Sequence, residues 1–204
     1  AQQFKTEDNQ LLVKGNATIL ADGTLNFQFS ETTKGLLYEN FTRFSQYTAK
    51  DLEISLKNRF SYLQGITFKK KEFNNNWKEA IFTSDFDFSA PNYAKVQGNN
   101  IIVNMIPVNR EETSLKKSKD RKFDFKVETG YVDEVSYLLT LPTGYKMPQK
   151  VDVLTVKSAF GEYQLEINPK ENNTFEIKRV YKQFSGTCAK EKYNDYVEFR
   201  RQIA

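Results

Sequence analysis

Two aspartates spaced for shared chemistry are the first notable feature of the sequence. Asp85 and Asp87 lie in the run 79–88, where they alternate with Phe86 and Phe88. In a strand, side chains at positions i and i+2 point to one face and lie roughly 7 Å apart. Paired carboxyl groups at that separation suit a glycosidase or a calcium site. A solvated polar face opposite the phenylalanines accounts for the same residues, so a carboxylate-based glycosidase is kept only as a remote alternative.

The residue types needed for most proton-transfer chemistry are missing. The chain has no histidine and one cysteine, Cys188. Ser-His-Asp and Cys-His catalysis and the common zinc sites use histidine near neutral pH, and a lone cysteine makes no internal disulfide. Cys188 precedes a predicted terminal helix, whose dipole favours a reactive thiolate, but an unreactive thiol is the simpler interpretation. We therefore expect a non-catalytic protein with no catalytic residue, no metal site and no cofactor.

Binding is the remaining kind of chemistry, and Trp77 is one candidate for it. This single tryptophan follows the asparagine run 74–76, which predicts a turn. Exposed aromatic side chains serve peptide- and glycan-binding sites, so exposed tyrosines and Trp77 would carry binding in a stand-alone surface module. Together with Asp85 and Asp87, Trp77 completes the set of candidate binding residues. The net charge of +4 is small, and the basic runs 69–71 and 116–122 lack interleaved aromatics. We therefore expect no nucleic-acid partner.

The cellular setting is constrained by two features. No apolar run approaches the roughly 20 residues that cross a bilayer, so we expect no membrane span. The sequence starts at Ala1 without methionine, which fits either a removed signal peptide or a segment of a longer protein. Both interpretations stay open on composition alone.

The first half of the chain predicts strands around a helix. Alternating apolar residues and the turn residues Asp22 and Gly23 indicate a hairpin formed by 10–20 and 25–30. Apolar residues at three-to-four spacing predict an amphipathic helix over about 35–60. It is one long helix or two short ones, because Thr48 with Asp51 is typical of a helix start. Strands are expected at 65–73, 79–88 and 101–106.

The second half predicts strands followed by a helix. The run 109–122 is almost entirely polar or charged, which indicates an interdomain loop. Strands are expected around 135–141, 163–167 and 174–184, and an apolar stripe over 190–203 predicts a C-terminal helix. We therefore expect a β-rich α+β fold of two antiparallel-sheet, sandwich-like lobes, 1–108 and 123–204, joined by the charged loop 109–122. The first lobe has the helix at 35–60 and the second has the C-terminal helix.

A series of residues along the chain is shared with a known kind of domain. In the second half the series comprises Arg121, Tyr131, Leu141-Pro142-Thr143-Gly144-Tyr145, Phe160-Gly161-Glu162-Tyr163, Ala189, Lys192-Tyr193, Tyr196, Phe199 and Ile203. It resembles the uncharacterised C-terminal domain that follows the transglutaminase-like core in exported proteins of Gram-negative bacteria. The first half is similar to the segment that joins this core to the terminal domain, at Asn16, Asp22-Gly23-Thr24-Leu25 and Gly35.

This resemblance implies an accessory module of an enzyme. The shared motifs are turns and strands, and no catalytic residue of the transglutaminase-like core carries over to this sequence. The resemblance implies an exported protein, periplasmic or at the cell surface, with an adjacent transglutaminase-like domain in the same polypeptide as partner. We expect a non-catalytic accessory or structural module. The alternative is a stand-alone module with a protein or glycan ligand.

Overall fold

Alternating apolar residues place four long strands in the first half of the chain. The computed structural model describes residues 5–145 and 153–204. Its first hairpin joins β1 (Gln10–Ile19) to β2 (Leu25–Lys34), and a second hairpin joins β3 (Thr67–Asn76) to β4 (Ile81–Ala90). The turn between β1 and β2 uses Gly23 at φ +84°, while the Asp22 carboxylate accepts the Thr24 N–H at 2.9 Å. The hairpin predicted around Asp22-Gly23 is confirmed.

The helical stretch between β2 and β3 is interrupted. The 3₁₀ turn η2 (Gly35–Leu37) leads into α1 (Tyr38–Thr42) and η3 (Arg43–Gln46), and α2 (Ala49–Arg59) follows. The break falls at Thr48, whose hydroxyl accepts the Asp51 N–H at 3.2 Å and so caps α2. Of the two expected arrangements, short helical segments are therefore the one observed.

The second half supplies four further long or edge strands and the closing helix. These strands are β8 (Tyr131–Thr140), β9 (Leu154–Ser158), β10 (Gly161–Pro169) and β11 (Thr174–Gln183). The chain ends in η4 (Lys190–Lys192) and α3 (Tyr193–Gln202). Short ribbons pair β5 (Lys95–Gln97) with β6 (Asn100–Ile102) and β7 (Phe125–Val127) with β12 (Gly186–Cys188). The predicted strand at 101–106 is thus reduced to β6.

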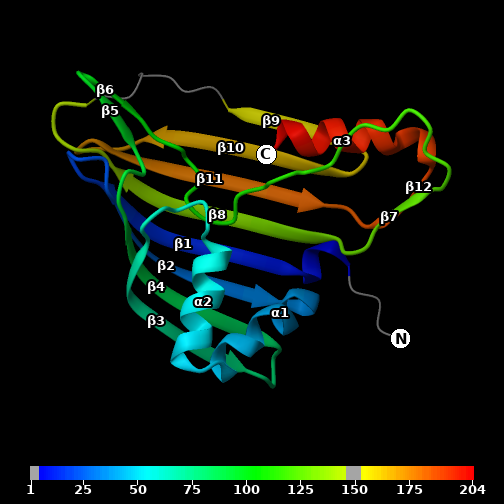
Figure 1. Cartoon of the computed structure of the whole chain (residues 1–204), viewed down its shortest axis with the longest axis horizontal. Helices are drawn as coiled ribbons and strands as arrows, with labels where there is room; N and C mark the ends of the chain where they lie inside the picture. The colour runs from blue at the N-terminus through cyan, green and yellow to red at the C-terminus, as the bar shows by residue number, and fades with distance from the viewer. Residues whose placement is uncertain (1–4, 146–152) are drawn as a thin grey trace.

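All eight longer strands belong to one mixed sheet, in the order β3-β4-β2-β1-β8-β11-β10-β9 (Figure 1). The halves meet where β1 runs parallel to β8, from Gln10 beside Val132 to Thr18 beside Thr140. The β-rich α+β class is confirmed, but the expectation of two antiparallel sheets is wrong. The cause is that strand periodicity indicates which face is buried but does not identify the neighbouring strand.

One face of the sheet is covered and the other is not. Helices α1, α2 and α3, together with the segment 103–124, lie on the same side (Figure 1). The segment 109–122 has no helix or strand, as expected, yet its beginning lies against the sheet: it follows the buried Val108, and its Glu111 is paired with Arg200 of α3. Because no second sheet faces the first, the arrangement among the described residues is not a sandwich.

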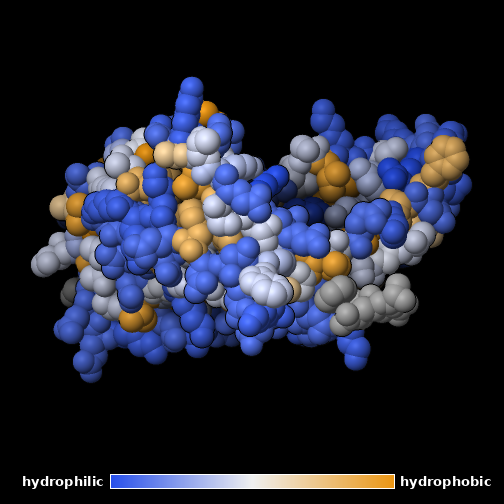
Figure 2. Space-filling model, turned by 90° about the horizontal axis from the view of Figure 1, so that it is seen from below, coloured by the Kyte–Doolittle hydropathy of each residue, from blue (hydrophilic) through white to orange (hydrophobic). Residues whose placement is uncertain are grey.

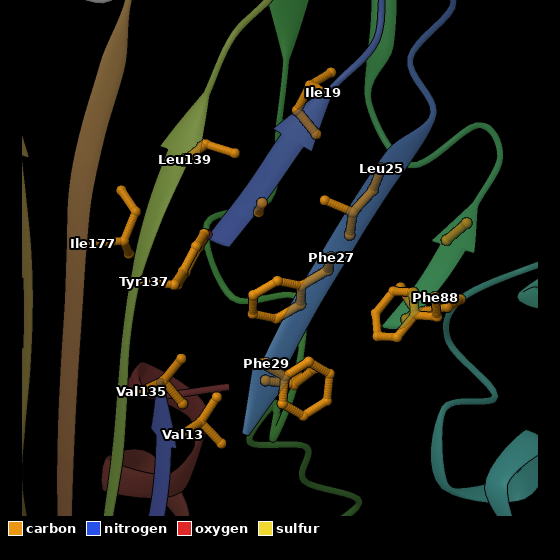
Figure 3. Packing of buried hydrophobic residues seen from close by; sticks show 14 of the residues in the cluster. Val13, Ile19, Leu25, Phe27, Phe29, Phe88, Val135, Tyr137, Leu139 and Ile177 are labelled. Atoms are coloured by element: carbon orange, nitrogen blue, oxygen red, sulfur yellow. The ribbon is translucent and has the colours of Figure 1, made fainter. Parts of the chain in front are cut away.

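The core consists of two apolar clusters on the covered face. The larger one lies under α2 and gathers Val13, Phe27, Phe29, Phe88, Tyr137 and Ile177 among others (Figure 3). The smaller one, around Tyr181, Phe160 and Phe199, is covered by α3. Close packing explains why position 15 is a glycine, since a Cβ there would lie 2.3 Å from the Gln28 carbonyl oxygen and 2.6 Å from the Phe29 Cβ.

Candidate functional site

The uncovered face of the sheet carries the predicted aspartates. Asp85 and Asp87 are half-buried in β4, and Asp87 accepts a hydrogen bond from Gln28 Nε2 at 2.9 Å. They line a shallow hollow of about 440 Å³ whose other polar side chains are Lys14, Asn16, Gln28, Ser30 and Lys70. The structure therefore places both carboxylates on a solvated polar face, where amide and ammonium groups surround them.

Trp77 lies apart from the aspartates. It is 73% exposed in the turn between β3 and β4, with Lys78 Nζ 5.8 Å from its ring centroid. The predicted turn at 74–76 is wrong, because Asn76 still pairs with Ile81 and the turn occupies 77–80. Asp85 lies four residues beyond Ile81, which amounts to roughly 13 Å along the strand. The three candidate residues do not form one site.

A second hollow lies on the uncovered face in the other half of the sheet. It has a volume of about 260 Å³, and its lining includes Lys157, Glu162, Gln164, Glu166, Lys178 and Lys182. Strands β1, β8 and β11 place Leu12, Leu138 and Val180 on the same face. Glu134 lies between Leu12 and Val180, and Leu138, 41% exposed, lies between Asn16 and Glu176. The uncovered face thus combines charges of both signs with separate apolar side chains.

The surface at the β3 edge is different in character. Viewed from the side of β3 and α2, it is mostly hydrophilic, with apolar residues scattered rather than gathered (Figure 2).

Among residues 5–145 and 153–204, no helix has both the length and the apolar composition that a membrane crossing requires. In the same ranges, no three His, Cys, Asp or Glu side chains lie together as metal ligands would.

On the covered face, six ionisable residues form a buried charge cluster: Glu31, Arg59, Glu111, Asp133, Arg179 and Arg200. Glu31 is completely buried and pairs with Arg59 of α2, which also donates to the Asn109 side chain at 3.1 Å. Burial opposes ionisation, so such groups are retained only where partners compensate. The pair connects α2 to β2 beneath the segment after β6.

Asp133 and Arg179 form the central pair of this cluster. Asp133 Oδ2 lies 2.7 Å from Arg179 Nη2, and the two side chains are 3% and 1% exposed. Burial raises the pKa of the Asp133 carboxyl to about 6, although the neighbouring Arg179 acts in the opposite direction. Arg179 lies between Ile177 and Tyr181 in β11, so the pair separates the two apolar clusters of the core.

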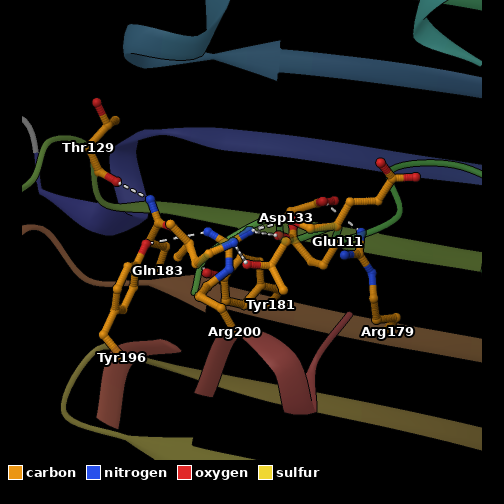
Figure 4. Close-up of polar contacts among 11 residues, drawn as sticks. Glu111, Thr129, Asp133, Arg179, Tyr181, Gln183, Tyr196 and Arg200 are labelled. Carbon is orange, nitrogen blue, oxygen red and sulfur yellow. Dashed lines mark hydrogen bonds and ion pairs between the residues drawn. The ribbon is translucent and has the colours of Figure 1, made fainter. Parts of the chain in front are cut away.

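The third pair joins the segment after β6 to the closing helix. Glu111 Oε2 accepts from Arg200 Nη2 at 2.9 Å, and Arg200 also donates to the Tyr196 hydroxyl at 3.4 Å. Burial raises the pKa of Glu111, and Arg200 opposes that shift. Figure 4 shows these side chains converging from β8, β11, α3 and the 109–112 segment. The cluster therefore fixes α3 and this segment onto the sheet.

Our sequence-based reasoning missed the buried charge cluster, although a signal for it exists. Glu31, Asp133 and Arg179 each occur in phase with the buried residues of their strands, as Phe29, Val135 and Ile177 show. Cys188, by contrast, is half-exposed at the end of β12 and packs against the smaller apolar cluster.

Comparisons with known proteins identify the family of the second half. No match was found among curated proteins, nor among solved structures. A family profile described as a domain of unknown function with a solved structure (DUF3858) matches residues 99–204, just over half of the 204-residue chain. These residues contain β8 to β11, α3 and most of the buried charge cluster. The chain therefore belongs to this family of domains of unknown function.

Proposed function

We propose that this chain is a non-catalytic accessory module of an exported transglutaminase-like protein, and that its uncovered sheet face packs against the transglutaminase-like domain of the same polypeptide. The observation that carries the proposal is the uncovered face itself. It spans both halves of an eight-stranded sheet and bears Leu138, 41% exposed, near the end of β8. Large single-layer sheets are usually covered on their apolar positions by another element.

Two sequence features support this assignment. The residue series from Arg121 to Ile203 resembles the terminal domain of such proteins, and all of it lies in the part matched by the family profile. The chain also has no histidine, so a Cys-His-Asp mechanism would have to reside in the neighbouring domain. An exported location, in the periplasm or at the cell surface, follows from the same resemblance.

The polarity of the face fits a domain contact of moderate size. Lys14, Ser136 and Lys178 lie in one row across β1, β8 and β11, with Asp85 and Glu166 further along it. Charges of both signs set the orientation of a partner, and the exposed Leu138 offers an apolar contact to it.

A binding measurement with one matched pair of variants tests the proposal. The separately purified transglutaminase-like domain of the same polypeptide is titrated with the wild-type chain in a calorimeter. Leu138→Arg should weaken binding at least ten-fold, because it replaces an exposed apolar contact of this face with a charge. Ile54→Arg, which changes a 50% exposed residue of α2 on the other side, should leave the affinity unchanged. Undetectable binding, or equal affinities for both variants, would contradict the proposal.

A stand-alone peptide- or glycan-binding module is the second candidate, and the exposure of Trp77 favours it. In that case a peptide and glycan array should show ligands for the wild-type chain that Trp77→Ala loses. The carboxylate-based glycosidase is the remote alternative. Any glycan hydrolysis by the purified chain would then disappear in Asp87→Asn, whereas undiminished hydrolysis would dismiss this role for Asp87.

A further inference from the structure

A small cavity opens beside the buried charge cluster. It has a volume of about 130 Å³ and lies between the 104–111 segment, β10, β11 and the end of α3. A buried space needs at least about 10–15 Å³ to admit a water molecule, so this cavity has room for several waters or a small organic anion. Its lining comprises Asn104, Ile106, Arg110, Glu111, Tyr163, Arg179, Ile203 and Ala204, and the Glu111 carboxylate is paired with Arg200.

Arg179 presents unused hydrogen-bond donors in this cavity. Its side chain is 1% exposed and its only ion-pair contact is Asp133 Oδ2, 2.7 Å from Nη2, among the residues that the structure describes. Within these residues, Nε and Nη1 have no hydrogen-bond partner. Buried guanidinium groups without partners are rare, because each donor loses its hydrogen bonds to water. A ligand with acceptor oxygens would satisfy them.

Arg110 supplies a second positive charge at the same cavity. Its Nε donates to the Ile106 carbonyl at 2.9 Å, and its guanidinium carbon lies 4.7 Å from the Tyr62 ring centroid and 5.8 Å from that of Tyr93. These contacts hold the guanidinium in place. No carboxylate lies within 4.0 Å of it in the described part of the chain.

Arginine side chains outnumber carboxylate side chains around the cavity. Arg59, Arg179 and Arg200 are paired with Glu31, Asp133 and Glu111, respectively, and Arg110 is the additional arginine. The next carboxylate along the chain, Glu112, is exposed, and it contacts Arg200 through its main-chain carbonyl. Four arginine side chains thus stand against three carboxylates, which favours an anion over a cation.

We propose that this cavity binds a short-chain aliphatic carboxylate. The planar guanidinium groups of Arg110 and Arg179 match the two oxygens of a carboxylate, and the Tyr163 hydroxyl offers a further donor. Ile106 and Ile203 form the apolar part of the wall, against which a short alkyl chain packs. The apolar wall is the reason for a carboxylate with an alkyl chain rather than an inorganic anion. This inference does not depend on the proposed function.

The test uses propionate as the probe and a matched pair of arginine variants. Saturation-transfer NMR and thermal unfolding are recorded with sodium propionate and with sodium chloride at equal ionic strength. Arg110→Gln removes the unpaired charge of the cavity. Arg121→Gln is the control, because Arg121 makes the same kinds of contact elsewhere: its Nε donates to the Phe123 carbonyl at 3.0 Å and it stacks over Tyr193 at 4.1 Å.

The wild-type chain and Arg121→Gln should both show propionate signals and a rise in Tm over the chloride sample. Arg110→Gln should bind propionate at least ten-fold more weakly. Arg110→Lys keeps the positive charge but loses the paired N–H donors of the guanidinium, so its affinity should lie between those of the wild-type chain and Arg110→Gln. Circular dichroism verifies that each variant is folded. If Arg110→Gln is not folded, Arg110→Lys is compared with Arg121→Gln instead. Equal binding by Arg110→Gln and Arg121→Gln would overturn the proposal. So would a propionate effect no larger than that of chloride, or equal displacement of propionate by phosphate.

Discussion

Replacing Asp133 by asparagine should change how the stability of the protein depends on pH. Burial raises the pKa of this carboxyl from 3.8 to about 6 in the folded state. Between these two values the folded chain binds more protons than the unfolded chain, so lowering the pH stabilises the fold. The difference of roughly two pKa units corresponds to about 3 kcal/mol.

This contribution is fully present below pH 3.8 and is lost as the pH rises through 6. Asparagine has nearly the same shape but does not titrate. The free energy of unfolding of the wild-type chain, minus that of Asp133→Asn, should therefore fall by roughly 2–2.5 kcal/mol between pH 4 and pH 8, because part of the full difference is already lost at pH 4. Taking this difference removes the titration of the other carboxylates, which both proteins share.

Urea unfolding at intervals of one pH unit, followed by circular dichroism, measures this difference. Asp120→Asn, at an exposed position of the charged loop, is the matched control and should show no such trend. The reasoning would be refuted by a flat difference, which means that burial does not raise the pKa. It would also be refuted by a difference that grows with pH, which means that Arg179 dominates and lowers the pKa instead.

Three further predictions concern the fold. Gly15→Ala should destabilise the chain by about 1–3 kcal/mol in urea unfolding, because its Cβ would overlap the Gln28 carbonyl, whereas Thr18→Ala on the solvated face should change little. Thr48→Ala should lose about 1 kcal/mol by removing the cap of α2, and Thr48→Ser should retain most of it; an equal loss in both variants would rule out the capping hydroxyl. The fragment 99–204 should fail to give dispersed amide NMR signals, because it lacks β1 and leaves the edge of β8 unpaired; a well-dispersed spectrum would show that the family region folds alone.

Local patterns in the sequence were sufficient for most of the elements. The turn at Gly23 depends on a backbone conformation that few residues adopt, and the cap at Thr48 depends on a side-chain hydroxyl, so both are visible in the sequence. In contrast, the edge strand β9 was missed, because its Leu154 is 46% exposed and shows no clear buried face.

The parallel pairing of β1 with β8 could not be read from the sequence. Val13 and Val135 are neighbours in space but lie far apart in the chain. The alternation of buried and exposed residues along a strand does not show which other strand lies beside it. The charged loop was expected to stay away from the core because its composition is polar. The structure shows that Glu111 is instead half-buried against Arg200, since ion pairing compensates for its burial.

The candidate binding residues show a similar limit. The alternation around Asp85 and Asp87 correctly placed both on a polar strand face, but Trp77 was grouped with them by type rather than by position. The ionisable residues with the most unusual surroundings are Asp133 and Arg179, which stand in phase with buried neighbours. A charged residue at a position where the strand alternation expects a buried side chain thus indicates a buried polar cluster. Which residues pair with that charge depends on the fold.

Lysine footprinting tests the central claim most directly. The isolated chain and the longer polypeptide with its transglutaminase-like domain are acetylated under identical conditions, and the modified lysines are quantified by mass spectrometry. The account predicts that Lys14 and Lys178, exposed on the uncovered face, are protected in the longer polypeptide. Lys50 on α2 and Lys95 on β5 should react equally in both samples. Equal reactivity of Lys14 and Lys178 in the two samples would contradict the claim that this face packs against the neighbouring domain.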